Sequence, residues 1–346
     1  MKREEAKILI ENIDKSILRI ADVKDIMINQ FRHGKIKGSK TYVSDIDEVM
    51  VNSTFKSRAW SWKPGEMNIW SGYNNEGKTK MLVYLALLKA INEGKKFVFF
   101  SPENFPPDEF FDDMVHTLVG TTTDRLAANF SMSEDTYVEA LEKIQDMFYV
   151  VYPLRDGKPD FRISVIEDVF KFLVWENDVF GCIVDPYIKI RHEMEPGEPE
   201  HLYASRFMMD RINFTRENQV SYNLVMHQVT PRKLQDGNYP KPNLYSIKGG
   251  GTFADSADNV ITIWRPLRGT DPISTEVSFI SEKIKNQKLV GIPFEVEMNF
   301  DRKKNRYISL NGRDYLDGSV KMKEDVYNPD KFTSSEIADF SEPPPF

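Results

Sequence analysis

The segment from residue 66 to 93 constrains the fold more than any other part of the chain. Residues 72–79 read GYNNEGKT and match the pattern G-x-x-x-x-G-K-[ST], with the apolar run MNIW before them and the helical run KMLVYLALLKAI after them. A glycine-containing turn between a strand and a helix directs backbone N–H groups and the positive helix end at bound phosphates. Because the pattern also occurs by chance in ordinary turns, the flanking strand and helix carry the prediction of a nucleotide site.

The residue types in this motif have distinct expected roles. Lys78 is expected to neutralise charge on the β- and γ-phosphates, and the Thr79 hydroxyl is expected to bind Mg²⁺. The predicted substrate is ATP or another NTP or dNTP, and the predicted cofactor is Mg²⁺. The residues expected to contact the nucleotide are Gly72, Asn74, Asn75, Gly77, Lys78, Thr79 and Lys80.

Apolar strand-like runs alternate with helical runs from about residue 55 to 311. This alternation is typical of a mostly parallel sheet that is covered by helices on both faces. Strands are predicted at 66–72, 95–102, 147–153, 180–187, 222–229 and 259–266, and helices at 79–93, 163–178 and 202–218. Two later segments, at 276–286 and 293–310, alternate polar and apolar residues and predict antiparallel strands. We therefore expect an α/β fold with antiparallel strands at its C-terminal end.

Polar side chains follow three of the predicted strands. Asp185 follows the run FGCIV, Glu103 follows KKFVFFSP, and His227 with Gln228 follows YNLVM. Near a P-loop, such groups can supply a second Mg²⁺ ligand, a general base for the attacking water, and hydrogen bonds to the γ-phosphate. Taken alone, each has a simpler interpretation: an aspartate that forms a turn before proline, a solvated loop glutamate, and an ordinary polar strand end.

In this order, the motifs resemble the RecA-like motor of the DnaB-type replicative helicases, and above all the Twinkle branch. The resemblance covers about residues 55–311 and rests on the P-loop, SPEN, IVDPY, VMHQVTPRK, YSIKGGGTFADSADNVITIWRP and ISEKIKNQKLVGIPFEVEMNFDRKKNRY. It implies a RecA-like core, a ring that is usually a hexamer, NTP between subunits and single-stranded DNA in the central channel. The site residues that it implies are Lys78 and Thr79 on phosphate and metal, Glu103 as base, Asp185 on the metal, His227 with Gln228 as γ-phosphate sensor, and Arg265 near the site.

The resemblance also implies a DNA-contacting loop at about 232–256. Basic side chains attract the phosphates of the strand, and glycines let backbone N–H groups approach them. Without the resemblance, a solvated surface loop is the simpler interpretation. The expected DNA contacts are Arg232, Lys233, Lys241, Lys248, Gly249, Gly250 and Gly251.

The chain departs from the family pattern on a late strand and in the P-loop, where Asn75 and Glu76 replace the usual small residues and Lys80 follows the threonine. Family members commonly carry Lys-x-Arg on a late strand, with the arginine reaching the neighbour's γ-phosphate, whereas this chain has Lys283-Ile284-Lys285. Lysine supplies charge but no planar bidentate fork, so cross-subunit activation is expected to be weaker or to come from another residue such as Arg302. Glu76 in the P-loop is expected to add negative charge beside the phosphates and to weaken binding mildly.

The regions on either side of the predicted motor differ from it in composition. Apolar residues at three-, four- and seven-residue spacings predict an amphipathic helix over 4–33, and the basic stretch 32–45 predicts a linker. The helix and linker (1–54) are expected to pack on an adjacent subunit or back on their own. About 55 residues are too few for a primase, so a primase is expected to be a separate partner. The acidic segment 312–346 predicts a flexible tail, which either recruits a replication protein or only solubilises the chain.

Overall composition limits the location and the partners. A net charge of −7 argues against a surface that binds nucleic acid everywhere, although a local basic loop is compatible with it. The single cysteine, Cys182, excludes an internal disulfide and fits a reducing compartment. The N-terminus lacks the features of a signal peptide, and no run approaches the ~20 apolar residues that a membrane span needs. We expect a cytoplasmic location, in a bacterium or a phage-infected host, and no membrane contact.

These expectations favour an NTP-dependent, ring-forming helicase that translocates on single-stranded DNA and unwinds duplex during replication. A phage origin is suggested by the stand-alone motor and by the composition rich in lysine, asparagine and isoleucine. Two alternatives stay open. One is a RecA-like DNA-dependent ATPase of the recombination type that does not unwind DNA. The other is a nucleotide-gated scaffold without catalysis, which the lysine at position 285 keeps open.

Overall fold

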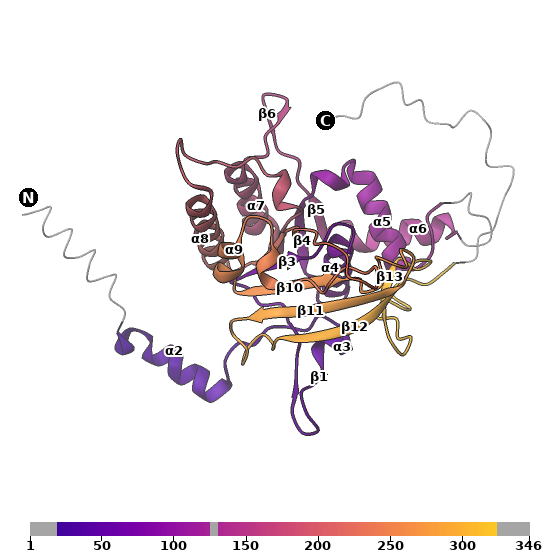
Figure 1. Ribbon diagram of the computed structural model, residues 1–346, viewed down its shortest axis with the longest axis horizontal. Coiled ribbons are helices and arrows are strands. Elements are labelled where there is room, and N and C mark those ends of the chain that lie inside the picture. Colours follow the sequence, from indigo (N-terminus) through magenta and orange to yellow (C-terminus); the bar gives the residue numbers. More distant parts are fainter. Residues whose placement is uncertain (1–18, 125–130, 324–346) are drawn as a thin grey trace, which may run out of the picture.

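A twisted sheet runs through the part of the chain that the computed structural model describes, residues 19–124 and 131–323 (Figure 1). In this part, the strand order is β13-β12-β11-β10-β3-β9-β8-β4-β5. The strands from β10 to β5 in this order pair in parallel, whereas β11, β12 and β13 are antiparallel additions at one edge. The predicted mostly parallel sheet with antiparallel C-terminal strands is therefore confirmed. The strands are β3 (Glu66–Ser71), β4 (Lys96–Phe100), β5 (Phe148–Val150), β8 (Val179–Val184), β9 (Ser221–Val225), β10 (Asn259–Trp264), β11 (Glu276–Ile284), β12 (Phe294–Asp301) and β13 (Arg306–Ser309).

Helices cover both faces of this sheet, because successive side chains of its central strands point to opposite sides. In β4, Phe97 and Phe99 join the core under α4, α5 and α6, whereas Val98 and Phe100 join the core under α7, α8 and α9. The helices are α4 (Lys78–Glu93), α5 (Pro107–Val119), α6 (Glu134–Ile144), α7 (Ile163–Asn177), α8 (Glu200–Asn218) and α9 (Gly251–Ser256). The 3₁₀ turns are η1 (Pro102–Asn104), η2 (Tyr187–Lys189) and η3 (Leu244–Ser246).

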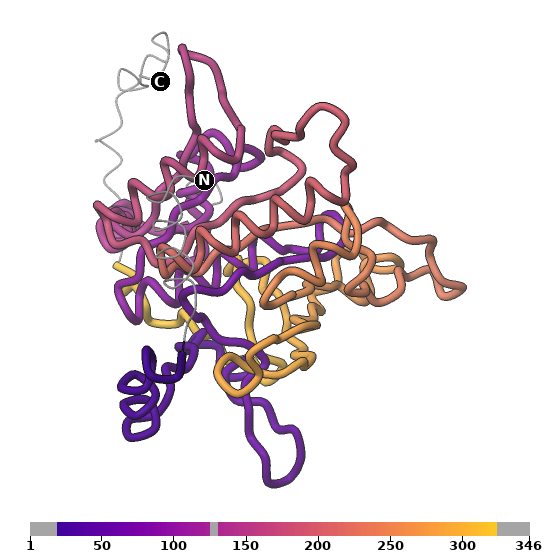
Figure 2. The backbone as a smooth tube through the Cα atoms, turned by 90° about the vertical axis from the view of Figure 1, so that its left-hand side faces the viewer, coloured from indigo at the N-terminus to yellow at the C-terminus, as the bar shows by residue number. Residues whose placement is uncertain are grey.

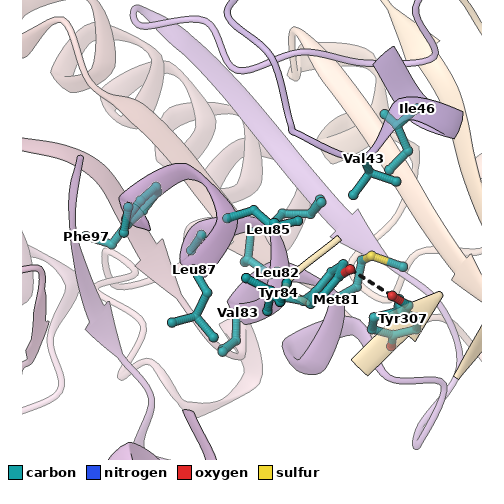
Figure 3. Close-up of a cluster of buried hydrophobic side chains, with 14 of the residues drawn as sticks. Val43, Ile46, Met81, Leu82, Val83, Tyr84, Leu85, Leu87, Phe97 and Tyr307 are labelled. Carbon is teal, nitrogen blue, oxygen red and sulfur yellow. Dashed lines mark hydrogen bonds between the residues drawn. The ribbon is translucent and has the colours of Figure 1, made fainter. Parts of the chain in front are cut away.

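Helix α4, which follows the P-loop, lies at the centre of the first core. Its side chains from Met81 to Leu88 are all almost fully buried, which explains why the sequence of this helix is apolar on every side. Figure 3 shows Tyr84 of this helix donating a hydrogen bond from its hydroxyl to the backbone oxygen of Tyr307, at 2.7 Å. The bond joins α4 to the last strand, β13, and so ties the P-loop helix to the antiparallel edge.

Two of the longer helices and two boundaries differ from the sequence-based expectations. Helices α5 and α6 were not predicted, although Pro107 at the first position of α5 and acidic residues in its first turn are recognisable start signals. The compact body begins before residue 55, where the sequence places the end of the helix and linker. Val43 and Ile46, around the short helix α3 (Ser44–Asp47), are fully buried in the first core. At the other end, Leu316 is fully buried in the same core, so the compact region extends past residue 312. The last residues, 324–346, lie outside the described part of the chain.

The predicted N-terminal helix is described from residue 20 onward, as α2 (Ile20–His33), while residues 4–18 lie outside the described part. Over its described length, α2 has no buried residue, and Ile20 and Phe31 are 76% and 92% exposed. Figures 1 and 2 show this helix projecting away from the layered body. Over its described length the helix therefore does not pack back on its own subunit.

Small hairpins complete the described fold. A hairpin of β1 (Val49–Met50) and β2 (Lys56–Ser57) and a second of β6 (Leu154–Arg155) and β7 (Lys158–Pro159) both extend from the body (Figure 1). Within the described residues, every helix is too short or too polar to cross a lipid bilayer.

Candidate nucleotide site

Residues 72–77 form a tight loop between β3 and α4, where the sequence predicts it, and Lys78 and Thr79 begin the helix. Gly72 and Gly77 have φ angles of +143° and +89°, which residues with a side chain rarely adopt. A Cβ at Gly72 would lie 2.4 Å from the backbone oxygen of Ile263, and a Cβ at Gly77 would lie 2.6 Å from the hydroxyl of Tyr307. Both glycines are thus required by backbone conformation and by space.

Lys78, the first residue of α4, is folded into this loop. Its side chain is almost fully buried, and its Nζ donates to the backbone oxygens of Gly72 and Tyr73 at 3.2 and 2.7 Å. Burial lowers the pKa of Lys78 to about 8, while the carboxylates of Asp185 and Glu76 act in the opposite direction. The loop therefore places an ammonium beside the positive N-terminus of α4, a combination suited to a phosphate group.

Thr79 and Asp185 meet directly although 106 positions separate them. The Thr79 hydroxyl donates to Oδ2 of Asp185 at 2.6 Å. Burial raises the pKa of Asp185 to about 6, against the opposing effects of the Thr79 hydrogen bond and the Lys78 charge. A hydroxyl and a carboxylate are the hard oxygen ligands that Mg²⁺ prefers, so these two side chains fit the expected metal.

A cavity of about 460 Å³ lies at this loop and brings the ends of four strands together. Its walls include Lys78 and Thr79 after β3, Glu103 after β4, Asp185 after β8 and His227 after β9. These are the residues for which the sequence predicts phosphate, metal, base and sensor roles. The structure thus collects them in one place, at the carboxyl edge of the parallel strands.

Glu103 lies in η1 with a side chain that is 44% exposed, and it forms an ion pair with Lys189 of η2 at 3.2 Å. An ion pair this exposed contributes only about 0–1 kcal/mol. The carboxylate can therefore exchange this lysine for a water molecule in the cavity at little cost.

His227 is half-buried in the wall of the same cavity. Burial lowers its pKa to about 4, and the charge of Lys78 acts in the same direction. The imidazole is therefore neutral near pH 7, with one nitrogen that donates and one that accepts. Its backbone oxygen accepts a hydrogen bond from the N–H of Lys248 at 2.8 Å.

Gln228, the expected companion of His227, points elsewhere. Its side chain is fully buried and donates from Nε2 to the Ser71 hydroxyl at 3.0 Å, and it does not line the main cavity. Its backbone N–H donates to the oxygen of Gly72 at 3.0 Å. Gln228 thus connects the end of β9 to the start of the P-loop.

Glu76 is expected to add negative charge beside the phosphates, but its carboxylate is buried and paired in the structure. It is 1% exposed and pairs with the Arg268 guanidinium at 2.9 Å, and it accepts a hydrogen bond from the backbone N–H of Arg265 at 2.5 Å. Burial nevertheless raises its pKa to about 7. The Arg265 side chain donates to the backbone oxygens of Pro272 and Ser274, and Arg268 also donates to the oxygen of Asn74.

Lys80 is partly engaged by a residue that sequence reasoning missed. It forms an ion pair with Asp113 on α5, and both side chains line the main cavity together with Asn75. Helix α5 also contributes Glu109 and Phe110 to the cavity wall. These residues escaped notice because α5 itself was not predicted.

The predicted DNA loop runs from the end of β9 to α9. Lys233 donates to the oxygen of Gly269 at 2.7 Å, and Lys241 pairs with Glu295 of β12 at 2.5 Å. Arg232 and Lys248 are exposed. Of the three expected glycines, 249 and 250 have positive φ angles and 251 begins α9.

The lysine pair on β11 does not line the main cavity of its own subunit. Lys283 donates to the backbone oxygens of Ala254 and Asp255 at the end of α9, at 2.9 and 2.7 Å. Lys285 forms an ion pair with the buried Asp258 at 2.9 Å and is 53% exposed.

A second, smaller cavity of about 200 Å³ adjoins the P-loop on the side of the antiparallel strands. It shares Asn75, Gly77 and Lys80 with the main cavity. Its other walls include the aromatic rings of Phe300 and Tyr307 and the side chains of Arg265 and Arg302.

Comparisons with known proteins support the fold. The chain is 26% identical over 247 residues to the Twinkle homolog protein, chloroplastic/mitochondrial, of Arabidopsis thaliana; the match covers 67% of this chain and 31% of that protein. A solved ATPase domain superposes with a TM-score of 0.65 at 16% identity, covering 84% of this chain and 99% of that one. The chain therefore has a RecA-like fold that is similar to that of DnaB/Twinkle-type proteins.

A second solved structure supports the same fold. A DnaB-like replicative helicase, studied with its interactions with primase, superposes with a TM-score of 0.63 at 13% identity over 88% of this chain and 71% of that one. No protein-family model matches the chain. The match to the DnaB/Twinkle-type relative spans about a third of that relative's length.

Proposed function

We propose that this chain is the motor of a replicative DNA helicase, which hydrolyses NTP to move along single-stranded DNA and separate a duplex. The observation that carries the proposal is the convergence of phosphate, metal, base and sensor side chains on one cavity at the P-loop. The sequence match to a Twinkle homolog supports the proposal that this nucleotide site serves DNA replication.

The P-loop residues bind the triphosphate. The N–H groups at the start of α4 and the ammonium of Lys78 hold its β- and γ-phosphates, which requires Lys78 to exchange the oxygens of Gly72 and Tyr73 for phosphate oxygens. Thr79 and Asp185 would hold Mg²⁺, which when bound neutralises charge that develops on the phosphates. Negative phosphates beside Lys78 also favour its charged form.

Glu103 and His227 act on the opposite side of the cavity. The Glu103 carboxylate releases Lys189, accepts a proton from the attacking water and orients it towards the γ-phosphate. The neutral imidazole of His227 donates a hydrogen bond to a γ-phosphate oxygen. When the γ-phosphate leaves, His227 loses this partner.

A short ladder of backbone hydrogen bonds connects His227 to the loop that would contact DNA. The N–H of Lys248 donates to the oxygen of His227, and the N–H of Val229 donates to the oxygen of Ser246, both at 2.8 Å. Gln228 joins the same segment to the P-loop at Gly72. A shift of His227 on hydrolysis is thereby passed to residues 246–251, which we propose contact the phosphates of the strand together with Arg232, Lys233 and Lys241.

We further propose that copies of the chain assemble into a ring through α2. The exposed apolar residues of this helix have no partner surface on the described part of their own subunit, and head-to-tail contacts close into rings when the rotation permits. A neighbour's Lys285 or Arg302 would then approach the γ-phosphate. Lys285 is the weaker candidate, because it would first have to leave Asp258.

The second cavity is the proposed site of the nucleobase. It adjoins the phosphate loop, and Phe300 and Tyr307 offer aromatic surface while Arg265 offers hydrogen-bond donors. We also propose that a primase is a separate partner protein and that the chain works in the cytoplasm of a bacterium or a phage-infected host.

Steady-state NTP hydrolysis, measured with and without single-stranded DNA, tests the proposal. We expect DNA to stimulate turnover in the assembled protein, and Glu103→Gln to abolish turnover while nucleotide binding persists. Glu109→Gln, which alters another exposed carboxylate in the wall of the same cavity, is the matched control and should retain turnover. Strand separation is then measured on a forked duplex.

The outcomes separate the proposal from its rivals. Stimulated hydrolysis without strand separation would favour a DNA-dependent ATPase of the recombination type. Nucleotide and DNA binding without turnover would favour a nucleotide-gated scaffold and would refute the motor.

A further inference from the structure

A third cavity, of about 280 Å³, lies between the segments that follow β8 and β9. Its walls come from η2 and the loop after it, from the first turns of α8, and from residues 226–227 and 248–249. It is distinct from the nucleotide cavity but shares one wall residue with it, His227.

The walls of this cavity are mainly aromatic and apolar. Tyr203 and Met226, both almost fully buried, contribute apolar surface that a polar ligand would not need. The rings of Tyr187 and His192 lie 4.8 Å apart and those of His192 and Tyr203 lie 5.5 Å apart, measured between centroids. Burial lowers the pKa of His192, so that its ring is neutral near pH 7 and presents an uncharged aromatic face.

Charged groups of both signs border this aromatic surface. Lys248 lines the cavity with an exposed side chain, and Gly249 beside it has a φ of +98° that brings the backbone close without a side chain. Glu200, at the start of α8, also lines the cavity. The site thus combines a stacking surface, a cation for a phosphate and a carboxylate that can accept a hydrogen bond from an amino group.

We infer that this cavity receives one base of the single strand, which stacks on His192 and Tyr187 while Lys248 contacts the adjoining phosphate. Base stacking on aromatic side chains combined with backbone contacts to lysine is a general mode of single-strand binding. Glu200 can accept a hydrogen bond from the exocyclic amino group of a base such as cytosine. Because His227 lines both cavities, a base of the strand and a bound NTP would contact the same imidazole.

The inference rests on the proposed function, which supplies the single strand, and it goes beyond phosphate contacts by the loop. An aromatic side chain of a neighbouring subunit is the competing occupant. The lysine and the backbone approach at Gly249 favour a nucleotide unit, since a protein side chain carries no phosphate to contact them.

The test compares two single strands of equal length in the full chain: a deoxycytidine oligonucleotide and an abasic oligonucleotide with the same phosphates. Dissociation constants are measured by fluorescence anisotropy at one fixed salt concentration. The variants are His192→Ala, which removes stacking surface, and Lys248→Ala, which removes the phosphate contact. His201→Ala replaces an exposed histidine nearby on α8 that does not line the cavity and serves as the control.

We expect the wild type to bind deoxycytidine about tenfold more tightly than the abasic strand. His192→Ala should reduce this ratio by about threefold or more, Lys248→Ala should weaken binding of both strands and keep the ratio, and His201→Ala should change neither. Equal binding of the two strands by the wild type would overturn this inference but leave the proposed function intact. An unchanged ratio in His192→Ala, with altered oligomer size by mass photometry, would assign the cavity to a neighbouring subunit. Failure to bind either strand, in protein that still hydrolyses NTP, would overturn the proposed function itself.

Discussion

Glutamine in place of Glu76 should make the stability of the protein less dependent on pH. Glu76 is 1% exposed, and burial raises its pKa from 4.5 to about 7 despite its pairing with Arg268. Between these two values the folded state binds more protons than the unfolded state, so the free energy of unfolding falls as pH rises through about 7. At 1.36 kcal/mol per pH unit, the ionised carboxylate costs about 3 kcal/mol of stability above this range.

Glutamine resembles the protonated acid and cannot ionise. The difference in unfolding free energy between the Glu76→Gln variant and the wild type should therefore move in favour of the variant by about 2 kcal/mol between about pH 5 and pH 8. The comparison uses this change with pH, because Arg265 and Arg268 donate to different oxygens of the carboxylate. Glutamine has an oxygen at only one of these two positions, so the substitution carries a constant cost of its own.

Urea unfolding, followed by tryptophan fluorescence at both pH values, measures this change. Glu109→Gln is the control, because Glu109 is exposed and its replacement should change the unfolding free energy by less than about 0.5 kcal/mol. The variant should also bind NTP more tightly, since Arg268 then keeps an uncompensated charge beside the P-loop. If the stability difference stays constant with pH, or moves in favour of the wild type, the pairing with Arg268 outweighs burial and the reasoning is wrong.

Four further predictions concern Lys78, the P-loop glycines, the nucleobase cavity and assembly of the ring. Burial lowers the pKa of Lys78 to about 8, so the affinity for NTP should fall as pH rises through about 8, as measured with a fluorescent nucleotide; constant affinity above that pH would contradict this role. Gly77→Ala should weaken nucleotide binding by about tenfold or more, because its Cβ meets the Tyr307 hydroxyl, whereas Gly94→Ala, with positive φ and open space, should cost only about 1 kcal/mol of stability. Phe300→Ala should raise KM for NTP but leave the affinity for inorganic triphosphate unchanged, and an equal loss for both ligands would remove the base from the second cavity. Phe31→Asp should shift the protein to smaller oligomers in mass photometry without lowering its stability, whereas Asn29→Asp on the opposite side of α2 should leave assembly unchanged.

Much of the fold could be read from the chain because its signals are local. Apolar runs identify the central strands, and β3, the P-loop and α4 are consecutive in sequence, so one pattern predicts all three. The meeting of Glu103, Asp185 and His227 at one cavity was predictable for a related reason: each follows a parallel strand, and parallel strands end at the same edge. Helix α5 was missed although its start signals are also local, which shows how easily proline and acidic residues are taken for a loop.

Partner choice, in contrast, depends on residues that are distant in sequence and meet only in the folded chain. The sequence determined that Glu76 stands inside the P-loop, but only the tertiary structure buries its carboxylate and pairs it with the partly buried Arg268, 192 positions away. The same holds for Gln228, which the fold turns towards Ser71 and away from the nucleotide cavity. The third cavity likewise exists only because the segments after β8 and β9 lie side by side. Local patterns specify which residues are available, whereas long-range packing decides which of them share a water-excluded space and therefore which charges and hydrogen bonds they feel.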